Sequence, residues 1–550
     1  GTGVGKTLGY IAPASVWAEK NDAPVWLSTY TRNLQHQIDQ ELDRLHADPA
    51  SKASRVVIRK GRENYLCLLN MEEALRGVAV QRQDAISLGL IARWAVRTRD
   101  GDLTGGDFPS WLIDLLGSRR TLELSDHQGE CIYSACSHYQ KCYIERSVRR
   151  ARRADLVIAN HALIMVQAVR GGPEGNARPT RVVFDEGHHV FDAADSAFSA
   201  TLSGREMMEL RRWLRGSETR GSGRARGLRR RIEDLLPNED GSVALEDVLR
   251  AAGVLPGEGW RQRVSEGEPR GAAEAFLTAV RGQVYARARG TDGPYDLECD
   301  INELVPGLLN AASKLKERLA RLERPLRVLR ESLNSRLENE ADTLETPTRL
   351  RIESMQRSIQ NRGEDVIGAW RNMLETLANK TPERFVDWFS VTRLGGREID
   401  VGMHRHWLDP TVPFTEQVAS SAEGLIVTSA TLRDGTGDAE ADWSAAEIRT
   451  GANHLPVPAV RVAVPSPFDY AKMTRVLVVN DVRKDDLRQV ASAYRELFLA
   501  SGGGALGLFT AISRLRAVHA KLLAPLDQAG LPLFAQRVDG LNLPTLIDVF

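Results

Sequence analysis

The sequence predicts an α/β fold built on parallel sheets. Short apolar runs recur along the chain and end in polar or small residues, at 25–27, 56–58, 156–159, 182–184, 425–427, 476–479 and 506–509. Runs without polar alternation are typical of strands that are buried on both faces of a parallel sheet. Helical patterns lie between many of these runs, as at 34–45 and 487–499. We therefore expect βαβ units as the main connections.

Two stretches interrupt this alternation and have the character of insertions. Residues from about 66 to 150 hold four of the five cysteines and no convincing strand, whereas residues from about 201 to 400 are helical and highly charged. An amphipathic stripe runs through Leu315, Leu319, Leu322, Leu326, Leu329, Leu333 and Leu337, and a second through Ile352, Met355, Ile359, Val366 and Trp370. We expect Pro325 to kink or interrupt the first helix. The two helices would pack antiparallel as an arch or hairpin, or simply form a helical bundle without catalytic residues.

Length and composition limit the classes of protein. A chain of 550 residues is too long for one core, and we expect three or four domains. Lys and Arg number 73 and so do Asp and Glu, so any site for nucleic acid must come from local clusters of basic residues. The sequence contains neither a membrane-spanning apolar run nor a secretory signal, and we expect a cytoplasmic protein. Residue 1 is Gly within a motif, so we expect that the natural start is missing.

That motif is a phosphate-binding loop. The residues Gly1, Thr2, Gly3, Val4, Gly5, Lys6 and Thr7 match G-x-x-x-x-G-K-[ST] with the first position absent. Backbone N–H groups of such a loop wrap phosphates, Lys6 would reach the β and γ phosphates of ATP, and the Thr7 hydroxyl would bind Mg²⁺. The helix that begins near Thr7 adds its positive end. Taken alone, the pattern also suits a structural loop and does not separate a helicase from a kinase or GTPase.

An acidic pair follows the apolar run at 182–184. Asp185 can hold Mg²⁺ through water, Glu186 can position and deprotonate the attacking water, and His188 can sense the γ-phosphate. By itself the pair would more often be a helix cap or a solvated pair, but together with the loop it indicates hydrolysis. The run at 425–427 leads into the hydroxyl-rich Thr428, Ser429, Ala430 and Thr431. These residues can link the hydrolysis site to a moving second domain, or form a plain turn.

These three segments resemble motifs I, II and III of superfamily 2 helicases with a DEAH-type box, in which Gly187 replaces the usual Ala. The segment from Ser28 through Thr31 and Arg32 to Gln37 is similar to motif Ia. The resemblance implies that Thr31 and Arg32 contact the backbone of single-stranded nucleic acid. Residues 506–510 resemble motif IV of a second motor domain. Nothing before Phe550 resembles motifs V and VI, so we expect this fragment to be a poorer ATPase than its parent.

Four cysteines form a separate constellation, namely Cys67, Cys131, Cys136 and Cys142. Disulfides are unexpected in a cytosolic ATPase. Spacing alone leaves zinc, unligated core cysteines and an iron-sulfur cluster open, although the paired C-x2-C knuckles of structural zinc sites are absent. The lead into Cys67 (residues 60–67), the later three-cysteine run and their position before the acidic pair resemble the DinG and XPD helicases. This resemblance implies a [4Fe-4S] cluster held by these four cysteines, and Cys299 lies apart from them.

A basic helix follows Cys142. Arg149 and Arg150 can grip phosphates at a duplex fork, or form a solvated basic face. Another basic stretch, from Arg211 to Arg231, is interrupted by glycines and is typical of a flexible linker.

The resemblance covers nearly the whole chain and implies two RecA-like motor domains. The first would comprise 1–65, 150–200 and 401–435, interrupted by an iron-sulfur domain at 66–149 and a helical arch domain at 201–400; the second would occupy 436–550. The expected function is an ATP-dependent DNA helicase or translocase, using ATP, Mg²⁺ and the cluster, monomeric, acting 5′ to 3′ on single-stranded and forked DNA, in DNA repair or replication restart. Alternatives are an ATP-switched iron-sulfur nucleic-acid binder and a remodeller of RNA or RNA-DNA hybrids.

Overall fold

The computed structural model describes residues 4–45, 48–77, 85–104, 106–109, 112, 124–126, 131–133, 136–170, 179–216, 218, 227–237, 239–288, 293–535 and 538. The chain divides into two compact units. The larger unit comprises Thr7–Ala85 and Leu124–Val462, and the smaller one comprises Gly1–Lys6, Ile86–Glu123 and Ala463–Phe550.

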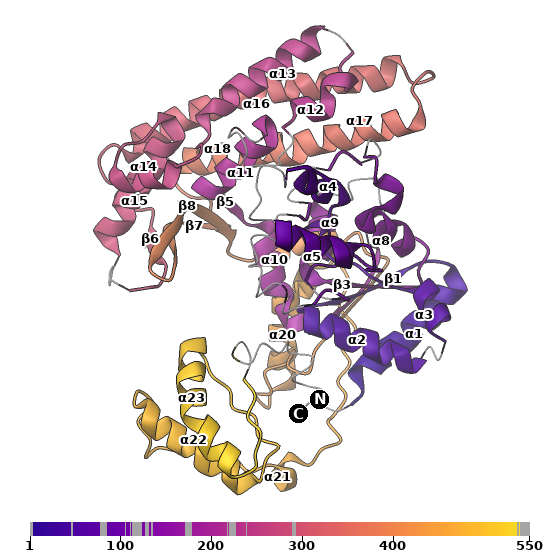
Figure 1. The fold of residues 1–550 in the computed structure, drawn as a ribbon, viewed down its shortest axis with the longest axis vertical. Helices are drawn as coiled ribbons and strands as arrows, with labels where there is room; N and C mark the ends of the chain where they lie inside the picture. The colour runs from indigo at the N-terminus through magenta and orange to yellow at the C-terminus, as the bar shows by residue number, and fades with distance from the viewer. Residues whose placement is uncertain are drawn as a thin grey trace. The chain divides into compact units, whose positions relative to one another are not determined.

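A five-stranded parallel sheet organises the larger unit (Figure 1). Its strands, in spatial order, are β2 (Val56–Ile58), β3 (Leu156–Asn160), β1 (Val25–Thr29), β4 (Arg181–Asp185) and β9 (Gly424–Thr428). All four pairings are parallel. The five strands predicted in this part of the chain, and the α/β class, are confirmed.

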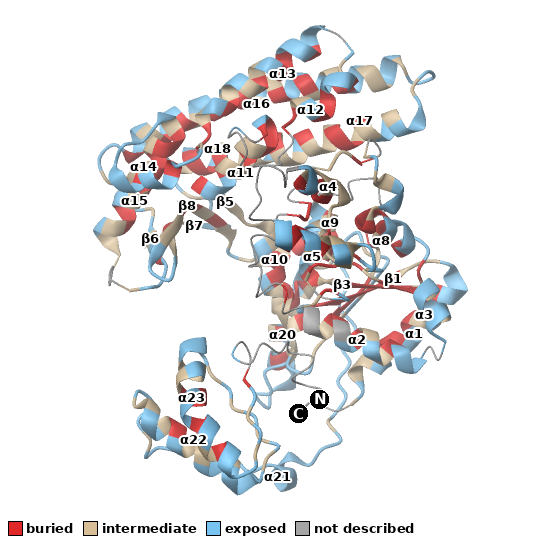
Figure 2. Ribbon diagram, viewed as in Figure 1, coloured by how far each residue is buried: buried red, intermediate tan, exposed pale blue. Residues whose placement is uncertain are grey.

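Helices cover both faces of this sheet, and alternate strand residues point to opposite faces. On one face Leu27 and Ile158 pack against α1 (Lys6–Asn21) and α2 (Arg32–Leu45). On the other, Phe184 packs against α9 (His161–Arg170) and α10 (Val190–Phe198). Strands β1, β3 and β4 are largely buried (Figure 2), whereas β9 at the edge of the sheet is exposed or half-buried. Burial on both faces explains why the runs of the central strands lack polar alternation.

The stretch before β3 is made of short helices joined by loops. They are α3 (Pro49–Arg55), η1 (Arg62–Asn64), α4 (Leu68–Gly77), η4 (Tyr139–Lys141) and α8 (Tyr143–Ala151) in the larger unit, with α5 (Ala85–Ala95) almost wholly in the smaller one. The only strand-like pairing among its described residues after β2 is a single bridge between Leu66 and Ser125.

The insertion after α10 is an α+β assembly. Its helices are α11 (Gly204–Arg215), α12 (Arg229–Ile232), η6 (Glu233–Leu235), α13 (Glu239–Ala251), η7 (Ala252–Val254), α14 (Trp260–Glu266), α15 (Gly271–Arg287), α16 (Leu308–Asn339), α17 (Thr346–Ser358), the π-helix η8 (Ile359–Glu364) and α18 (Asp365–Thr376). The two predicted leucine-rich and mixed stripes lie on α16 and on α17–α18, which pack against each other. Pro325 does not interrupt α16, which runs through it.

A four-stranded antiparallel sheet, which the sequence analysis did not predict, lies within this insertion. Its order is β5 (Ala200–Ser203), β8 (Arg397–Trp407), β7 (Phe385–Leu394) and β6 (Leu297–Asp300). The β7–β8 turn uses Gly395 and Gly396 at φ +60° and +82°, a conformation that favours glycine. The chain then returns to the parallel sheet through α19 (Thr411–Phe414) and the π-helix η9 (Thr415–Ala419), and continues after β9 into α20 (Ala439–Thr450) and η10 (Ala452–His454).

The C-terminal part of the smaller unit contains α21 (Tyr470–Met473), α22 (Leu487–Ser501) and α23 (Ile512–Gln528). Its core joins Ala491 to Val518, Leu522 and Leu526. The strands predicted at 476–479 and 506–509 are wrong, because neither segment forms a strand ladder among the described residues. Val476 is 84% exposed, so the apolar composition of the first run is not matched by burial.

No helix among the described residues is long and apolar enough to cross a membrane.

A buried ion pair is expected to stabilise the antiparallel sheet. Arg405 donates from Nε and Nη2 to the two carboxylate oxygens of Asp387 at 2.7 and 2.6 Å, and Nη2 also donates to Thr376 at 2.8 Å. Removing one partner leaves a buried charge uncompensated. We predict that Arg405→Ala lowers the free energy of unfolding of this region by about 3 kcal/mol or more. Arg397→Ala, an exposed arginine on the same strand, should change it by less than about 0.5 kcal/mol. Urea unfolding followed by circular dichroism measures both, and equal effects would contradict the assignment.

Candidate nucleotide site

The phosphate-binding loop leads directly into α1. Gly1, Thr2 and Gly3 lie outside the described residues. Val4 and Gly5 precede the helix, and Gly5 has φ +71°, a conformation that the glycine of the motif allows. Lys6 is the first helical residue and Thr7 the second. The first N–H groups of a helix have no intrahelical acceptor, and a helix start can therefore bind an anion.

Tyr10 links this helix to the acidic strand. Its hydroxyl donates to Asp185 Oδ2 at 3.0 Å and also hydrogen-bonds the Thr7 side chain. Burial, and then the charge of Asp185, raise the pKa of the Tyr10 hydroxyl, so it stays protonated and acts as a donor. Sequence reasoning missed Tyr10, although its position three residues after Thr7 places both on one helix face. The two residues predicted to bind Mg²⁺ are thereby connected through one side chain.

The chain turns sharply after Asp185. Asp185 is buried, and its Oδ1 accepts from the backbone N–H of Glu186 at 3.0 Å. Glu186 has φ +54°, which is uncommon for a residue with a side chain and is often found at functional sites. The turn begins the 3₁₀-helix η5 (Gly187–His189) and places Glu186 and His188 beyond the carboxyl end of β4, where ligands bind in open parallel sheets.

The acidic segment and the hydroxyl-rich segment meet at this sheet edge. Asp185 is in register with Thr428 on the neighbouring strand. His188 Nδ1 lies 2.7 Å from Ser429 Oγ. Longer contacts join Ser429 Oγ to Glu186 Oε2 at 3.4 Å and Thr431 Oγ1 to His188 Nδ1 at 3.3 Å. The structure therefore brings together two predicted site segments that are separated by more than 240 positions in sequence.

A group of aromatic and histidine side chains lies beside this edge, and the sequence analysis missed it. Tyr30 stacks on His189 with ring centroids 3.9 Å apart and an interplanar angle of 14°. The ring centroids of His189 and His188 are 4.1 Å apart. His161 Nδ1 lies 2.7 Å from Ser28 Oγ, and burial lowers the pKa of His161 to about 4. This histidine is therefore neutral at physiological pH. The Tyr30–His189 stack brings the segment after β1 into direct contact with the segment after β4.

The residues predicted to contact nucleic acid have different environments. Thr31 Oγ1 accepts from the Leu34 N–H at 3.3 Å, at the start of α2. The side chain of Arg32 lies outside the described residues. Arg150 donates to the carbonyls of Ala53 and Val56 at 2.6 and 3.3 Å, and so ties α8 to the segment entering β2.

Arg149 shows a similar use of its guanidinium. It donates to the Glu145 carbonyl at 3.2 Å and lies 5.7 Å from the centroid of the Tyr139 ring. Both predicted phosphate-binding arginines thus have partners within the protein.

The four predicted cluster ligands are half-buried cysteines that form no disulfide. The Cys67 N–H donates to the Leu124 carbonyl at 2.8 Å, and the Tyr133 N–H donates to Cys131 Sγ at 3.3 Å. Cys142 precedes the first residue of α8, and the Cys136 N–H donates to the Tyr133 carbonyl at 2.9 Å.

Arg62 lies at the centre of this subregion. It donates to Asp126 at 2.6 Å, and its guanidinium is 5.3 Å from the centroid of the Tyr133 ring. Burial raises the pKa of the Cys131 and Cys142 thiols, and the positive charge of Arg62 opposes that shift for both. Among the described residues no three Cys, His, Asp or Glu side chains converge closely enough to hold a metal ion. The donor chemistry therefore fits a cluster, while a closed ligand set is not formed.

A parallel sheet, a helix that starts at Lys6 and Thr7 and an acidic pair after a neighbouring strand are features that P-loop nucleotide-binding proteins share. No family model matches the chain. Comparison with curated proteins finds relatives that are named as helicases. The chain is 31% identical over 221 residues to the ATP-dependent DNA helicase YoaA of Haemophilus influenzae, covering 38% of this chain and 32% of that one.

Two further curated relatives carry the DinG name. The chain is 32% identical over 225 residues to the ATP-dependent helicase DinG of Mycobacterium tuberculosis, covering 37% of this chain and 32% of that protein. It is 24% identical to the 3′-5′ exonuclease DinG of Bacillus subtilis over 100% of this chain and 55% of that protein. The chain thus spans about a third to a half of the relatives it matches. The predicted resemblance to DinG-type helicases is confirmed.

Among solved structures, an XPD helicase aligns with 94% of this chain and 69% of its own, at 11% identity and a TM-score of 0.33.

Gly187 lies close to β9. A Cβ at this position would lie 2.2 Å from Val427 Cγ1 on β9. The DEAH-type motif that this segment resembles usually has Ala at the same position. We predict that Gly187→Ala lowers the free energy of unfolding by about 1–3 kcal/mol through overpacking. The double variant Gly187→Ala with Val427→Ala should lose less unfolding free energy than the two single variants lose together, because the smaller side chain at 427 makes room for the added methyl group. Denaturant unfolding of the four proteins measures the coupling, and additive effects would show that Val427 is not the obstacle.

Proposed function

We propose that this protein is an ATP-dependent DNA helicase or translocase. The observation that carries the proposal is the network joining Glu186, His188 and Ser429 at the carboxyl edge of the parallel sheet. The resemblance to helicases named DinG and YoaA supports ATP as the nucleotide and DNA as the partner. Translocation from 5′ to 3′ rests on the resemblance alone.

The proposed chemistry assigns a role to each segment of the site. The loop from Gly1 to Gly5 would wrap the phosphates of ATP with backbone N–H groups, and Lys6 would contact the β and γ phosphates. Oxygen donors are what Mg²⁺ requires, and Thr7 and Asp185, joined through Tyr10, fit that requirement. When bound, Mg²⁺ would neutralise phosphate charge during transfer.

Glu186 would orient the attacking water and accept its proton. The contacts of its carboxylate with Ser429 and His188 hold it at the sheet edge. Since phosphoryl transfer depends on positioning and electrostatics, a small displacement of β9 against β4 would change the position of this carboxylate. We assign Thr428, Ser429, Ala430 and Thr431 the coupling role on this ground.

The stack of Tyr30 on His189 provides a second connection, between the proposed DNA-contacting residues and the hydrolysis site. Tyr30 is 41% exposed and precedes Thr31 and Arg32, the residues proposed to contact single-stranded DNA. Its partner His189 belongs to η5, the turn that also carries His188. DNA bound at 31–32 would therefore act on the hydrolysis site through one stacked pair.

Hydrolysis is tested by an isosteric change at the proposed base. We predict that Glu186→Gln lowers the kcat of ATP hydrolysis in the presence of single-stranded DNA by about 100-fold or more, while ATP affinity stays within about threefold because the phosphate-binding loop is unchanged. Glu416→Gln, an exposed carboxylate in the same unit, is the matched control and should hydrolyse like the wild type. ATP turnover without DNA stimulation would favour an ATP-switched binder. Equal turnover by the Glu186 variant would contradict its role.

We also propose that Cys67, Cys131, Cys136 and Cys142 hold a [4Fe-4S] cluster. The four cysteines supply the thiol donors that such clusters use, and Cys131 and Cys142 lie within reach of the positive charge of Arg62. The charge of Arg62 would offset part of the negative charge of the thiolates. Ligation would deprotonate thiols that burial otherwise keeps neutral.

Anaerobic purification with iron and acid-labile sulfide analysis tests the cluster. We predict about four of each per chain in the wild type and loss of both in Cys136→Ser. Cys299→Ser is the matched control, because Cys299 lies in β6 of the antiparallel sheet, and it should keep both. Zinc without sulfide in the wild type would contradict the cluster and indicate a zinc site. The absence of any metal would indicate that the four cysteines are unligated core residues.

A further inference from the structure

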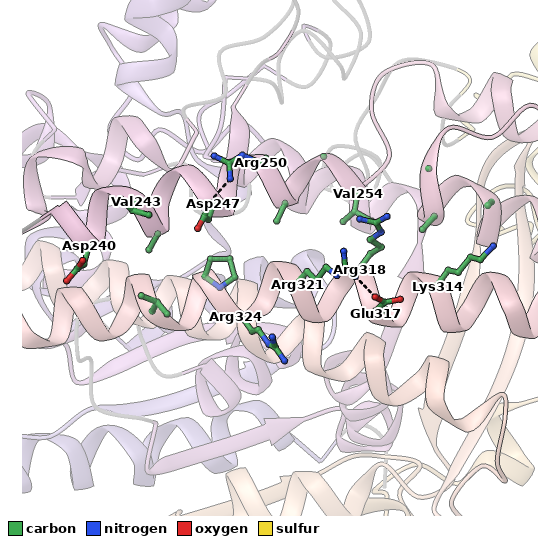
Figure 3. A pocket seen from close by; sticks show the side chains of 18 residues that line it. Asp240, Val243, Asp247, Arg250, Val254, Lys314, Glu317, Arg318, Arg321 and Arg324 are labelled. Carbon is green, nitrogen blue, oxygen red and sulfur yellow. Dashed lines mark hydrogen bonds and ion pairs between the residues drawn. The ribbon is translucent and has the colours of Figure 1, made fainter.

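A long groove runs along the insertion between α13 and α16 (Figure 3). Its volume is about 1450 Å³, larger than the roughly 300–1,000 Å³ of ordinary small-molecule sites. One wall is α13 from Asp240 to Ala251, and the other is α16 from Lys314 to Val328. At 1.5 Å per residue, that part of α16 is about 21 Å long. These dimensions match a helical segment of another chain better than a small molecule.

The α16 wall is basic. Lys314, Arg318, Arg321 and Arg324 recur along it at steps of three or four residues, so they share one face of the helix. Arg321 is paired with Glu317. Lys314, Arg318 and Arg324 are exposed. Among the described residues, none of the three takes part in a hydrogen bond or an ion pair. Three unpaired cations thus line about 15 Å of the wall.

The acidic groups of the groove are mostly neutralised within it. Asp247 accepts from Arg250 at 2.8 Å, and Glu317 is occupied by Arg321. Asp240 is the remaining carboxylate among the lining residues. The unpaired groups therefore carry three positive charges and one negative charge, which favours an acidic ligand.

The rest of the lining is aliphatic. Val243 on α13 and Val328 on α16 are 54% and 47% exposed, and Val254, Ala272 and Pro325 continue the apolar surface. None of the described residues that line the groove is aromatic, so this lining offers no stacking platform of the kind that single-stranded nucleic acid uses.

We propose that this groove is a docking site for an acidic, amphipathic helical segment of a partner protein. Apolar side chains at three- and four-residue steps would cover Val243 and Val328, as in other helix-in-groove complexes. Acidic side chains on the flank of the same segment would pair with Lys314, Arg318 and Arg324. The proposal is independent of the hydrolysis site and concerns recruitment of the protein.

A designed probe tests this docking site. The probe is a fluorescein-labelled peptide of about 18 residues, long enough to cover the wall as a helix, with leucines at three- and four-residue steps and glutamates on one flank. A scrambled peptide of the same composition, a lysine-for-glutamate peptide and an oligothymidine of similar length are the comparison ligands. Fluorescence anisotropy is measured at low and moderate salt with the whole protein.

We predict that the patterned acidic peptide binds in the micromolar range and at least tenfold more tightly than the scrambled peptide. Charge reversal by Arg318→Glu with Arg324→Glu should weaken it at least tenfold, because several exposed ion pairs are lost or made repulsive. Arg261→Glu, an exposed arginine on α14 in the same insertion, is the matched control and should bind like the wild type. Val328→Ser should weaken binding without changing its salt dependence.

Three outcomes would overturn the proposal. Equal binding of patterned and scrambled peptides would show non-specific charge attraction. Oligothymidine binding that the same double variant abolishes would assign the groove to nucleic acid. Unchanged peptide binding by a double variant with wild-type circular dichroism and thermal midpoint would place the peptide elsewhere.

Discussion

The parallel pairing of β4 with β9 is the interaction on which the candidate site depends. Asp185 and Thr428 occupy adjacent positions in this ladder, and the contacts of His188 and Glu186 with Ser429 follow from that register. A slip of one residue would turn every side chain of β9 to the other face. The intervening insertion is compatible with this pairing, because the entropy of closing a loop rises only slowly with its length and the inserted chain builds its own core.

The sequence predicted the parallel sheet well because burial on both faces leaves an apolar signature in the central strands β1, β3 and β4, and the edge strand β9 has the same apolar composition although it is exposed or half-buried. It failed for the antiparallel sheet of the insertion, whose strands are only partly apolar and lie among helices. The best available signal was the Gly395–Gly396 pair between β7 and β8, since a two-residue glycine turn between alternating segments indicates a hairpin. The runs at 476–479 and 506–509 show the opposite error. An apolar run becomes a strand only when a neighbour supplies hydrogen bonds, and these two segments have no ladder partner among the described residues.

Much of the candidate site was predictable from motif chemistry, but its connections were not. Asp185, Glu186, His188 and Ser429 are recognisable because their residue types and spacing suit phosphoryl transfer. Tyr10 and His189 act through residues far away in sequence, and neither has a signature of its own. The contacts of Arg149 and Arg150 with backbone carbonyls were equally hidden, because an arginine on a basic helix has the same sequence pattern with or without such contacts. Partner choice depends on tertiary geometry.

The insertion joins the parallel sheet through a hydrogen-bonded neck. The chain enters along β5 and leaves along β8, and Ala200 is paired with Arg405 across this antiparallel ladder. His406 on β8 lies 2.8 Å from the Asp195 carboxylate on α10. Helix α10 begins at Val190, next to His189. Both strands of the neck are paired and β8 contacts α10, so the insertion is joined to α10 through hydrogen-bonded elements. The helix with the unpaired cations and the turn with Glu186, the proposed catalytic base, therefore belong to one unit and are connected through the ladder between β5 and β8 and the contact of β8 with α10.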